Sequence, residues 1–278
     1  MDNLDGFVFD DALAEPILHE MGWTVETVSW RDEVVDWAKY RLVILRTTWD
    51  YFDFLPEFLA KIEFIASKTP IANPLPIIRW NADKVYLKEL ESKGIRIVPT
   101  SWGQSLQSTT NIRRFFDEFS ADELIIKPTI SAGACETFRL TKNSDLQPVL
   151  DAFSNRPFMV QPFIDSVVNE GEYSIFYFGG KYSHTILKTP KTDDFRVQEE
   201  HGGIITAVPR SEELIKISEN ILSKINEPLL YARVDLVKNE QGEFCLMELE
   251  LIEPALYLRM DPNAPKRFAE AINEFLTN

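Results

Sequence analysis

Tyr231-Ala-Arg-Val-Asp-Leu-Val237 and Leu246-Met-Glu-Leu-Glu-Leu251 are the two stretches that decide the fold. In both, polar residues alternate with apolar ones, which predicts two strands that each have one polar and one apolar face. Gln241-Gly242 lies between them and is typical of a tight turn, so the two strands are expected to form an antiparallel hairpin.

This register places Asp235 opposite Glu248 and Arg233 opposite Glu250. Three carboxylates would then share a small patch of sheet, and a hard divalent cation with oxygen ligands would compensate their charge. The alternative is an ordinary solvated face of an antiparallel strand, where carboxylates are common. The hairpin alone leaves both readings open.

Outward from the hairpin, the chain alternates strand and helix patterns at its start and is rich in strands towards its end. The fold class expected is α/β followed by α+β, with a parallel sheet in the N-terminal part. Strands are predicted at Trp23–Val28, Arg41–Arg46, Ile95–Pro99, Leu124–Pro128, Glu136–Leu140, Phe158–Gln161, Tyr173–Phe178 and Lys181–Leu187. Helices are predicted from a cap at Asp10-Asp11 to Met21, at Pro56–Ser67, from Asn81 to Lys93, at Asn111–Phe119, at Ser211–Lys224 and at Pro265–Phe275.

Asn73-Pro-Leu-Pro76 is a stiff connection that breaks helices and is the best candidate for a domain boundary. It separates residues 1–75 from the rest of the chain, which is expected to divide further into residues 76–160 and 161–278. At the N-terminus, Gly6 to Phe9 is too brief for a convincing first strand. The loop Thr47–Tyr51 follows a predicted parallel strand, so it is either a capped turn or a ligand loop.

Composition limits the classes of partner. The 278 residues include 29 Lys+Arg and 44 Asp+Glu, a formal net charge of -15. This balance argues against binding of nucleic acid or of an anionic membrane surface, both of which need a basic stripe. It leaves room for an anionic ligand in a local cationic pocket.

The cysteines and the hydropathy pattern indicate a cytoplasmic protein. Cys135 and Cys245 have no CxxC spacing, so two small buried thiols in a reducing compartment are expected. The N-terminal stretch is acidic where a signal peptide would be basic, and no apolar run approaches the ~20 residues of a membrane span.

Two lysines and one long loop are candidates for anion binding. Lys127 ends a strand before the small-residue turn Ser131-Ala-Gly-Ala134, whose backbone amides could approach an anion, and Lys84 is expected in the first turn of a helix. Each lysine alone is more often a solvated surface group. The segment from Lys188 to Gly203 is a long polar excursion that carries Arg196; it is either a functional loop or a surface loop. Neither a Walker nor a Rossmann glycine motif is present.

Taken in order, these motifs resemble the ATP-grasp superfamily. The motifs are Asn81-x-x-Lys84, Lys127-Pro with its small-residue loop, Val160-Gln-Pro-Phe-Ile164 before Gly171-Glu-Tyr-Ser174, and Arg233-Val-Asp235 with Glu248-x-Glu250. The loop from Lys188 to Gly203 resembles that of the glutathione-synthetase-like branch. Arg46-Thr-Thr-Trp-Asp-Tyr51 and Glu250-Leu-Ile-Glu-Pro254 look closest to relatives of the ligase that forms cycloserine. Gln161 and Glu250 stand where many members have Glu and Asn.

The resemblance implies a pre-ATP-grasp domain followed by two ATP-grasp subdomains that hold ATP and one or two Mg²⁺ ions. Asp235, Glu248 and Glu250 would be the metal ligands. Residues expected to contact the nucleotide are Lys84, Lys127, Ser131, Ala132, Gly133, Gln161, Pro162, Phe163, Ile164 and Glu172. Arg233, Arg196 and Lys188 would act on the transferring group and the acceptor carboxylate.

The implied activity is a carboxylate–amine ligase that works through an acyl phosphate on a small amino-acid-like substrate, releasing ADP and phosphate. The alternatives are an ATP-binding regulatory protein without catalysis and an ATP-grasp phosphotransferase. Small carboxylates and amines are the expected partners, and a homodimer is possible for this class. His184 is expected to be structural, whereas His201 lies in the proposed substrate loop.

Overall fold

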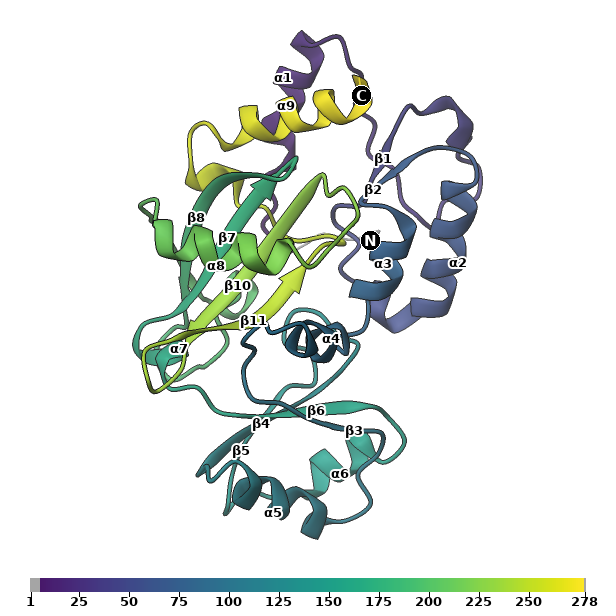
Figure 1. Cartoon of the computed structure of the whole chain (residues 1–278). Helices are drawn as coiled ribbons and strands as arrows, with labels where there is room; N and C mark the ends of the chain where they lie inside the picture. Colours follow the sequence, from purple (N-terminus) through teal and green to yellow (C-terminus); the bar gives the residue numbers. More distant parts are fainter. Residues whose placement is uncertain (1–5, 278) are drawn as a thin grey trace.

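The computed structural model describes residues 6–277 and contains three sheets (Figure 1). Near the N-terminus, β1 (Val43–Ile44) pairs in parallel with β2 (Ile71–Ala72), and the helices α2 (Leu55–Ala66) and α3 (Leu75–Asn81) lie beside this pair. Their core combines Trp30, Trp37, Tyr51, Phe58, Ile62 and Ile78. The two larger sheets are antiparallel, so the predicted fold class is confirmed.

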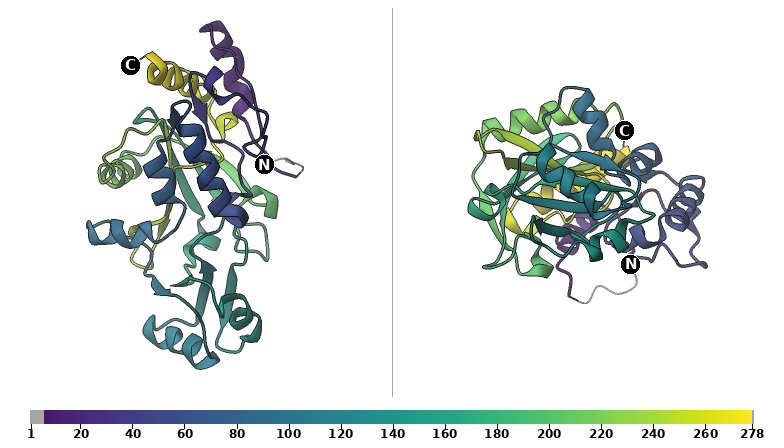
Figure 2. Two further views of the ribbon diagram at one scale, coloured as in Figure 1. Left: turned by 90° about the vertical axis from the view of Figure 1, so that its right-hand side faces the viewer. Right: turned by 90° about the horizontal axis from the view of Figure 1, so that it is seen from below.

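The start of the chain follows the sequence prediction only in part. Residues 6–9 form no strand, in keeping with the brevity of Gly6 to Phe9, and residues 1–5 lie outside the described residues. Asp10 and Asp11 do not cap a helix, because their carboxylates bind Arg259 and Arg46 instead. The chain forms a 3-10 turn at Asp11–Ala14 and then α1 (Glu15–Glu20), which packs beside the C-terminal helix (Figure 2).

The stretch Trp23–Val28 is not a strand either. Alternation is present, but Val25 and Val28 are each 38% exposed, and Trp23 is held by a hydrogen bond to Asn273 rather than by a neighbouring strand. Two further 3-10 turns, Trp37–Lys39 and Tyr51–Phe54, complete this part of the chain. A strand needs a backbone partner, which the alternation of side chains does not supply.

The four-stranded sheet has the order β3-β6-β4-β5 and forms the lower part of the molecule in Figure 1. Its strands are β3 (Ser101–Gly103), β4 (Glu123–Pro128), β5 (Phe138–Thr141) and β6 (Phe158–Pro162). The helices α5 (Thr109–Glu118) and α6 (Gln147–Phe153) pack on one face through Ile112, Phe116, Val149 and Phe153. Because β6 extends to Pro162, the predicted boundary at residues 160/161 falls inside a strand of this sheet.

The five-stranded sheet has the order β11-β10-β7-β8-β9 and carries the hairpin that decides the fold. Its strands are β7 (Glu172–Phe178), β8 (Lys181–Thr189), β9 (Ile204–Val208), β10 (Tyr231–Lys238) and β11 (Phe244–Glu250). The remaining elements are α7 (Ser166–Asn169), α8 (Glu212–Leu222), α9 (Ala264–Thr277) and the 3-10 turns Glu199–His201 and Leu258–Met260. Asp235 pairs with Glu248 and Arg233 with Glu250, so the predicted register is confirmed.

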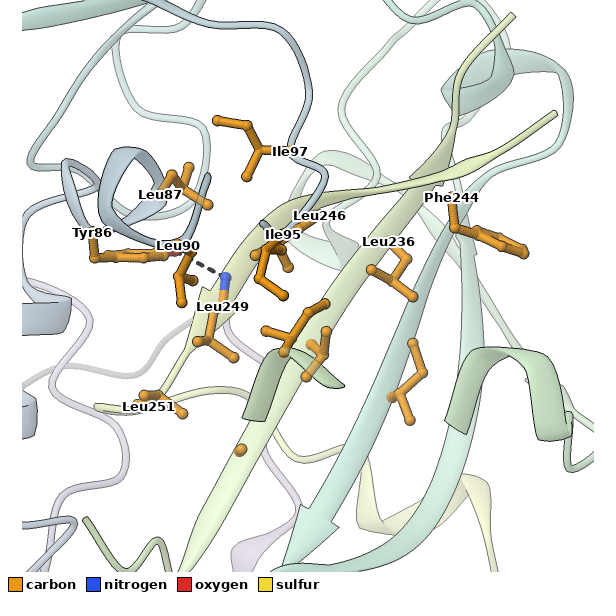
Figure 3. Close-up of a cluster of buried hydrophobic side chains, with 14 of the residues drawn as sticks. Tyr86, Leu87, Leu90, Ile95, Ile97, Leu236, Phe244, Leu246, Leu249 and Leu251 are labelled. Atoms are coloured by element: carbon orange, nitrogen blue, oxygen red, sulfur yellow. Dashed lines mark hydrogen bonds between the residues drawn. The ribbon is translucent and has the colours of Figure 1, made fainter. Parts of the chain in front are cut away.

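The apolar face of this hairpin packs against α4 (Tyr86–Ser92), as Figure 3 shows. Leu246 and Leu249 meet Leu87 and Leu90, and the Tyr86 hydroxyl accepts a hydrogen bond of 2.9 Å from the Leu249 amide. Since successive side chains of a strand alternate between faces, the acidic residues of β10 and β11 point away from this core.

Among residues 6–277, no helix is long and apolar enough to cross a membrane.

Candidate active site

A cavity of about 410 Å³ is lined by residues of both antiparallel sheets and of the N-terminal segment. Every residue that the sequence predicts for the site reaches this cavity. They are Lys84, Lys127, Ser131, Ala132, Gly133, Gln161, Pro162, Phe163, Ile164, Glu172, Lys188, Arg196, Arg233, Asp235, Glu248 and Glu250. Segments far apart in the sequence thus line one cavity. The hydrogen-bond and ion-pair partners of each residue are different.

Asp235 is the most deeply buried acid of the cavity, with 1% of its surface exposed. Arg233 and Lys188 donate to its carboxylate at 2.9 and 3.3 Å, and Ser174 donates from the neighbouring strand at 2.5 Å. Burial by itself would raise the pKa of Asp235, but the two cations outweigh it and the pKa is lowered. Asp235 is therefore an ionised carboxylate held in a fixed position.

Lys188 also pairs with Glu172 at 2.5 Å, across the β7–β8 ladder. Burial lowers the pKa of Lys188, whereas Asp235 and Glu172 raise it by more, so the lysine stays charged. The Glu172 carboxylate, predicted as a nucleotide contact, is thus engaged with a buried lysine in this structure.

Glu248 pairs with Lys84 at 3.0 Å. Burial opposes ionisation of Glu248, but Lys84 and Lys127 lower its pKa. Lys84 does not lie in the first turn of a helix, which corrects the sequence prediction: α3 ends at Asn81 and α4 begins at Tyr86, so Lys84 lies in the turn between them. Asn81 ends α3 because its amide bonds Leu249 and Leu251 of the hairpin strand.

Lys127 has no ion pair or hydrogen bond to its ammonium group within residues 6–277. It is partly buried, and loss of hydration lowers its pKa, with Lys84 adding to the effect. A cation in this condition is stabilised by an anion that enters the cavity, as the phosphates of a nucleotide would.

Glu250 carries the least compensated charge of the hairpin. Arg233 forms an ion pair with it, yet burial, together with Glu248 and Asp235, raises the pKa of Glu250 to about 7. Over residues 6–277, no three acidic, histidine or cysteine side chains already converge as a metal-binding group. The donors nevertheless fit Mg²⁺, because three carboxylates on paired strands offer the oxygen ligands that this ion prefers.

The small-residue loop after β4 is held against Lys84. Lys84 donates through its amide to Thr129 and through its ammonium to the Ser131 carbonyl, at 2.8 and 2.6 Å. Gly133 and Ala134 have φ values of 60° and 55°, a conformation that exposes backbone groups to a ligand.

The segment between β8 and β9 covers another side of the cavity. Arg196 forms a bidentate pair with Asp194 at 3.1 and 2.9 Å, which lowers the pKa of Asp194. His201 contacts the Gly133 carbonyl at 3.1 Å, and so joins this segment to the small-residue loop. Arg259 joins it to the N-terminal segment through Glu199 at 2.6 Å and Asp10 at 2.9 Å. Arg196 is thus already paired where a free cation was expected.

Several lining residues were missed by the sequence analysis. Trp49 and Tyr51 come from the loop after β1, and Glu253 and Tyr257 from the segment after β11. Both stretches were recognised as motifs, but no pattern identified these particular side chains. The loop Thr47–Tyr51 is therefore more than a capped turn, because two of its side chains face the cavity.

The side chain of Gln161 turns to the protein. Its amide donates to the Thr100 hydroxyl at 3.0 Å, so the segment from Gln161 to Ile164 offers backbone groups to the cavity. His184 is structural as expected, since it stacks on Phe176 at 4.3 Å and bonds the Leu256 carbonyl. Cys245 is buried, but Cys135 is exposed, so the prediction of two buried thiols is wrong for Cys135, which lies at the end of the small-residue loop.

Comparison with known proteins supports the resemblance found in the sequence. The N-terminal domain of the D-cycloserine synthetase DcsG matches residues 1–73, and the ATP-grasp domain of prokaryotic glutathione synthetase matches residues 96–255. The chain is 29% identical to the cycloserine biosynthesis protein DcsG of Streptomyces lavendulae, over 96% of this chain and 97% of that protein. A glutathione synthetase of Vibrio parahaemolyticus is 22% identical over 54% of this chain and 53% of its own.

Solved structures agree. The D-cycloserine synthetase DcsG superposes with a TM-score of 0.85 and 27% identity, covering 95% of this chain and 94% of that one. The D-alanine–D-alanine ligase of Bacillus anthracis shares the fold alone, with a TM-score of 0.66 and 13% identity over 96% and 91% of the two chains. The expected class of enzyme, an ATP-grasp ligase that forms C–N bonds, is confirmed.

Because the glutathione synthetase match spans more than half of the chain, the protein belongs to the ATP-grasp family of the prokaryotic glutathione synthetases.

Proposed function

We propose that the protein is an ATP- and Mg²⁺-dependent carboxylate–amine ligase that acts through an acyl phosphate on a small amino-acid-like substrate. One observation carries the proposal: Asp235, Glu248 and Glu250 meet Lys84, Lys127, Lys188 and Arg233 in a single cavity. Phosphoryl transfer needs little covalent chemistry from a protein, but it needs charge stabilisation of this kind at fixed positions.

Asp235, Glu248 and Glu250 would hold one or two Mg²⁺ ions, which supply charge neutralisation for the phosphates of ATP. Lys84 and Lys127 would bind phosphate oxygens, and the loop Ser131–Gly133 would lie over them. The backbone from Gln161 to Ile164 would receive the adenine, and Glu172 would lie near the ribose. Arg233 and Lys188 would stabilise the group in transfer.

The reaction then proceeds in two steps. A carboxylate oxygen of the substrate bonds to the γ-phosphorus, the bond from that phosphorus to the β–γ bridging oxygen breaks, and ADP leaves. An amine nitrogen next attacks the acyl carbon and loses a proton, and phosphate leaves with the former carboxylate oxygen. The segment between β8 and β9, with Arg196, would exclude water from the acyl phosphate.

The relatives named for cycloserine make an amino-acid-derived substrate the leading choice, with the amine and the carboxylate in one molecule or in two. Three statements remain predictions: the division into residues 1–75, 76–160 and 161–278, the cytoplasmic location, and the homodimer.

Release of ADP tests the proposal. The full chain is incubated with Mg²⁺, ATP and a panel of amino acids and simple carboxylates, with hydroxylamine as a general amine. We expect ADP and an acyl hydroxamate with at least one carboxylate. Tight ATP binding without ADP release would favour the regulatory alternative, and a phosphoester without free phosphate would favour the phosphotransferase.

A further inference from the structure

Glu253 is a buried acid that the phosphate chemistry does not use. Only 7% of its surface is exposed, and the residue lines the cavity together with Trp49 and Tyr51 of the N-terminal segment. Within residues 6–277, no hydrogen bond or ion pair reaches its carboxyl group. A buried carboxyl without a partner is costly in every protein, so its position in the cavity wall calls for an explanation.

The backbone around Glu253 is fixed from three sides. Three consecutive carbonyl groups each accept a side-chain hydrogen bond: Ile252 from the Tyr231 hydroxyl at 2.7 Å, Glu253 from the Trp49 indole at 2.8 Å, and Pro254 from Arg46 at 2.5 Å. These bonds hold the backbone in place, so the Glu253 side chain is anchored at the cavity wall before a ligand binds.

The surroundings of Glu253 favour a positive ligand. Burial raises the pKa of Glu253, with Glu250 and Glu248 adding to the effect and Arg46 and Lys84 opposing it. Arg46 bonds the Pro254 carbonyl and pairs with Asp11 at 3.2 Å, and it does not line the cavity. A positively charged ligand beside Glu253 would therefore stabilise the ionised form of its carboxyl group.

The shape of the wall favours an organic ammonium group over a metal ion. Trp49 and Tyr51 line the same cavity, and aromatic rings attract cations through their quadrupole. Mg²⁺ needs several oxygen ligands, and this wall supplies one carboxyl group among aromatic rings. A primary ammonium group donates three hydrogen bonds and accepts none, and so suits a carboxylate beside an aromatic face.

We propose that Glu253 binds the primary ammonium group of the substrate, with Trp49 and Tyr51 as its aromatic walls. The inference deepens the proposed function and rests on it. With the ammonium group held at Glu253, the rest of a small molecule extends towards Lys188 and Arg233, which line the same cavity. The site would thus select amino-acid-derived substrates against carboxylic acids that lack the amine.

Binding of two related rings tests the assignment without turnover. D-cycloserine carries a primary amine, and isoxazolidin-3-one is the same ring without it. Both are titrated by calorimetry into the full chain saturated with Mg²⁺ and ADP, in a buffer that keeps the amine protonated. We expect wild type to bind D-cycloserine about 10- to 100-fold more tightly than isoxazolidin-3-one, the range for a hydrogen bond to a charged group.

The variant Glu253→Gln keeps the shape of the side chain and removes its charge, so we expect it to bind the two rings with similar affinity. Glu200→Gln removes the same charge from an exposed residue at the rim and should keep the discrimination. Thermal melting checks that Glu253→Gln remains folded; loss of an unpaired buried acid should not lower its melting temperature.

Three results would each overturn the ammonium site. They are equal affinity of wild type for the two rings, no binding of D-cycloserine, and a difference in affinity for the two rings that persists in Glu253→Gln. These outcomes leave the ligase proposal standing if Mg²⁺-dependent ADP release is observed. Absence of ADP release with every carboxylate contradicts the ligase proposal instead, so the two failures are distinguishable.

Discussion

Lys188 Nζ lies 3.3 Å from Asp235 Oδ2, although strand β7 separates their two strands in the sheet. The lysine also binds Glu172 at 2.5 Å and is 2% exposed. Lys188 thus balances Glu172 by itself and shares Asp235 with Arg233. This arrangement gives Lys188 a structural role besides any role in catalysis.

We expect Lys188→Met to lower the free energy of unfolding by about 3–5 kcal/mol, because it leaves the buried Glu172 without a cation and leaves Asp235 with Arg233 alone. Urea denaturation measures the change. Lys181→Met is the control, since the pair of Lys181 and Glu274 is 71% and 53% exposed and such pairs contribute less than about 1 kcal/mol. Equal effects of the two substitutions would contradict the account.

Removing charge from the proposed metal ligands Asp235 and Glu248 should slow the reaction. We expect Asp235→Asn and Glu248→Gln each to slow ADP release by roughly 100-fold or more, the scale of lost charge stabilisation in a transition state. A Mg²⁺ titration of the rate separates weaker metal binding from a lower maximum. Glu89→Gln, on the surface beside Lys93, is the matched control. Wild-type rates in both site variants would show that the carboxylates have been assigned wrongly.

His184 should make the protein less stable in acid. Burial, with the positive charge of Arg267, lowers the pKa of His184 from 6.5 to about 4. The unfolded chain therefore binds more protons between these two values, so stability is complete above pH 6.5 and falls as the pH decreases through this window.

At pH 5 this loss is on the order of 2 kcal/mol, from about 1.4 kcal/mol for each pH unit below 6.5. We expect the stability advantage of wild type over His184→Gln, measured by urea denaturation, to shrink by that amount between pH 7.5 and pH 5. A constant difference between the two proteins would mean that the pKa of His184 is the same in the folded and the unfolded chain, and would contradict the account.

Arg259 connects two segments of the chain that lie at the cavity. It binds Asp10 at 2.9 Å and Glu199 at 2.6 Å, and so connects the N-terminal segment with the segment between β8 and β9. We expect Arg259→Gln to speed hydrogen exchange in residues 195–203 and to raise KM for the acceptor several-fold, with KM for ATP nearly unchanged. Arg210→Gln, which removes an exposed pair with Glu212, should do neither. If hydrogen exchange in residues 195–203 is the same in Arg259→Gln as in wild type, Arg259 does not hold the two segments together.

The hairpin could be predicted from the sequence because its information is local. Alternation fixes which side chains share a face, and Asp235 lies opposite Glu248 as predicted. Nearer the turn the register is shifted by one residue, since Leu236 pairs with Leu246, and a bulge between Asp235 and Leu236 restores the predicted pairs. The partners of these acids could not be predicted in the same way. Lys84 and Lys188 reach them from distant parts of the chain, and only the folded arrangement of α3, α4 and β8 sets those distances.

The weakest predictions concern the N-terminal part. Asp10 and Asp11 carry the composition of a helix cap, but tertiary ion pairs with Arg259 and Arg46 take precedence. Glu253 belongs to a motif that the sequence shows, but its position in the cavity wall depends on distant residues. Tyr231, Trp49 and Arg46 bond the backbone carbonyls on and beside it. Local patterns do not record which buried group lacks a partner.

Transfer of oxygen from the substrate to phosphate tests the central claim most directly. A carboxylate substrate identified by ADP release is labelled with ¹⁸O in its carboxyl group, and the phosphate formed during ligation is analysed by mass spectrometry. An acyl phosphate requires each released phosphate to carry one oxygen from the carboxylate, so we predict phosphate with a single ¹⁸O in step with ADP. Unlabelled phosphate accompanying ADP would contradict the account.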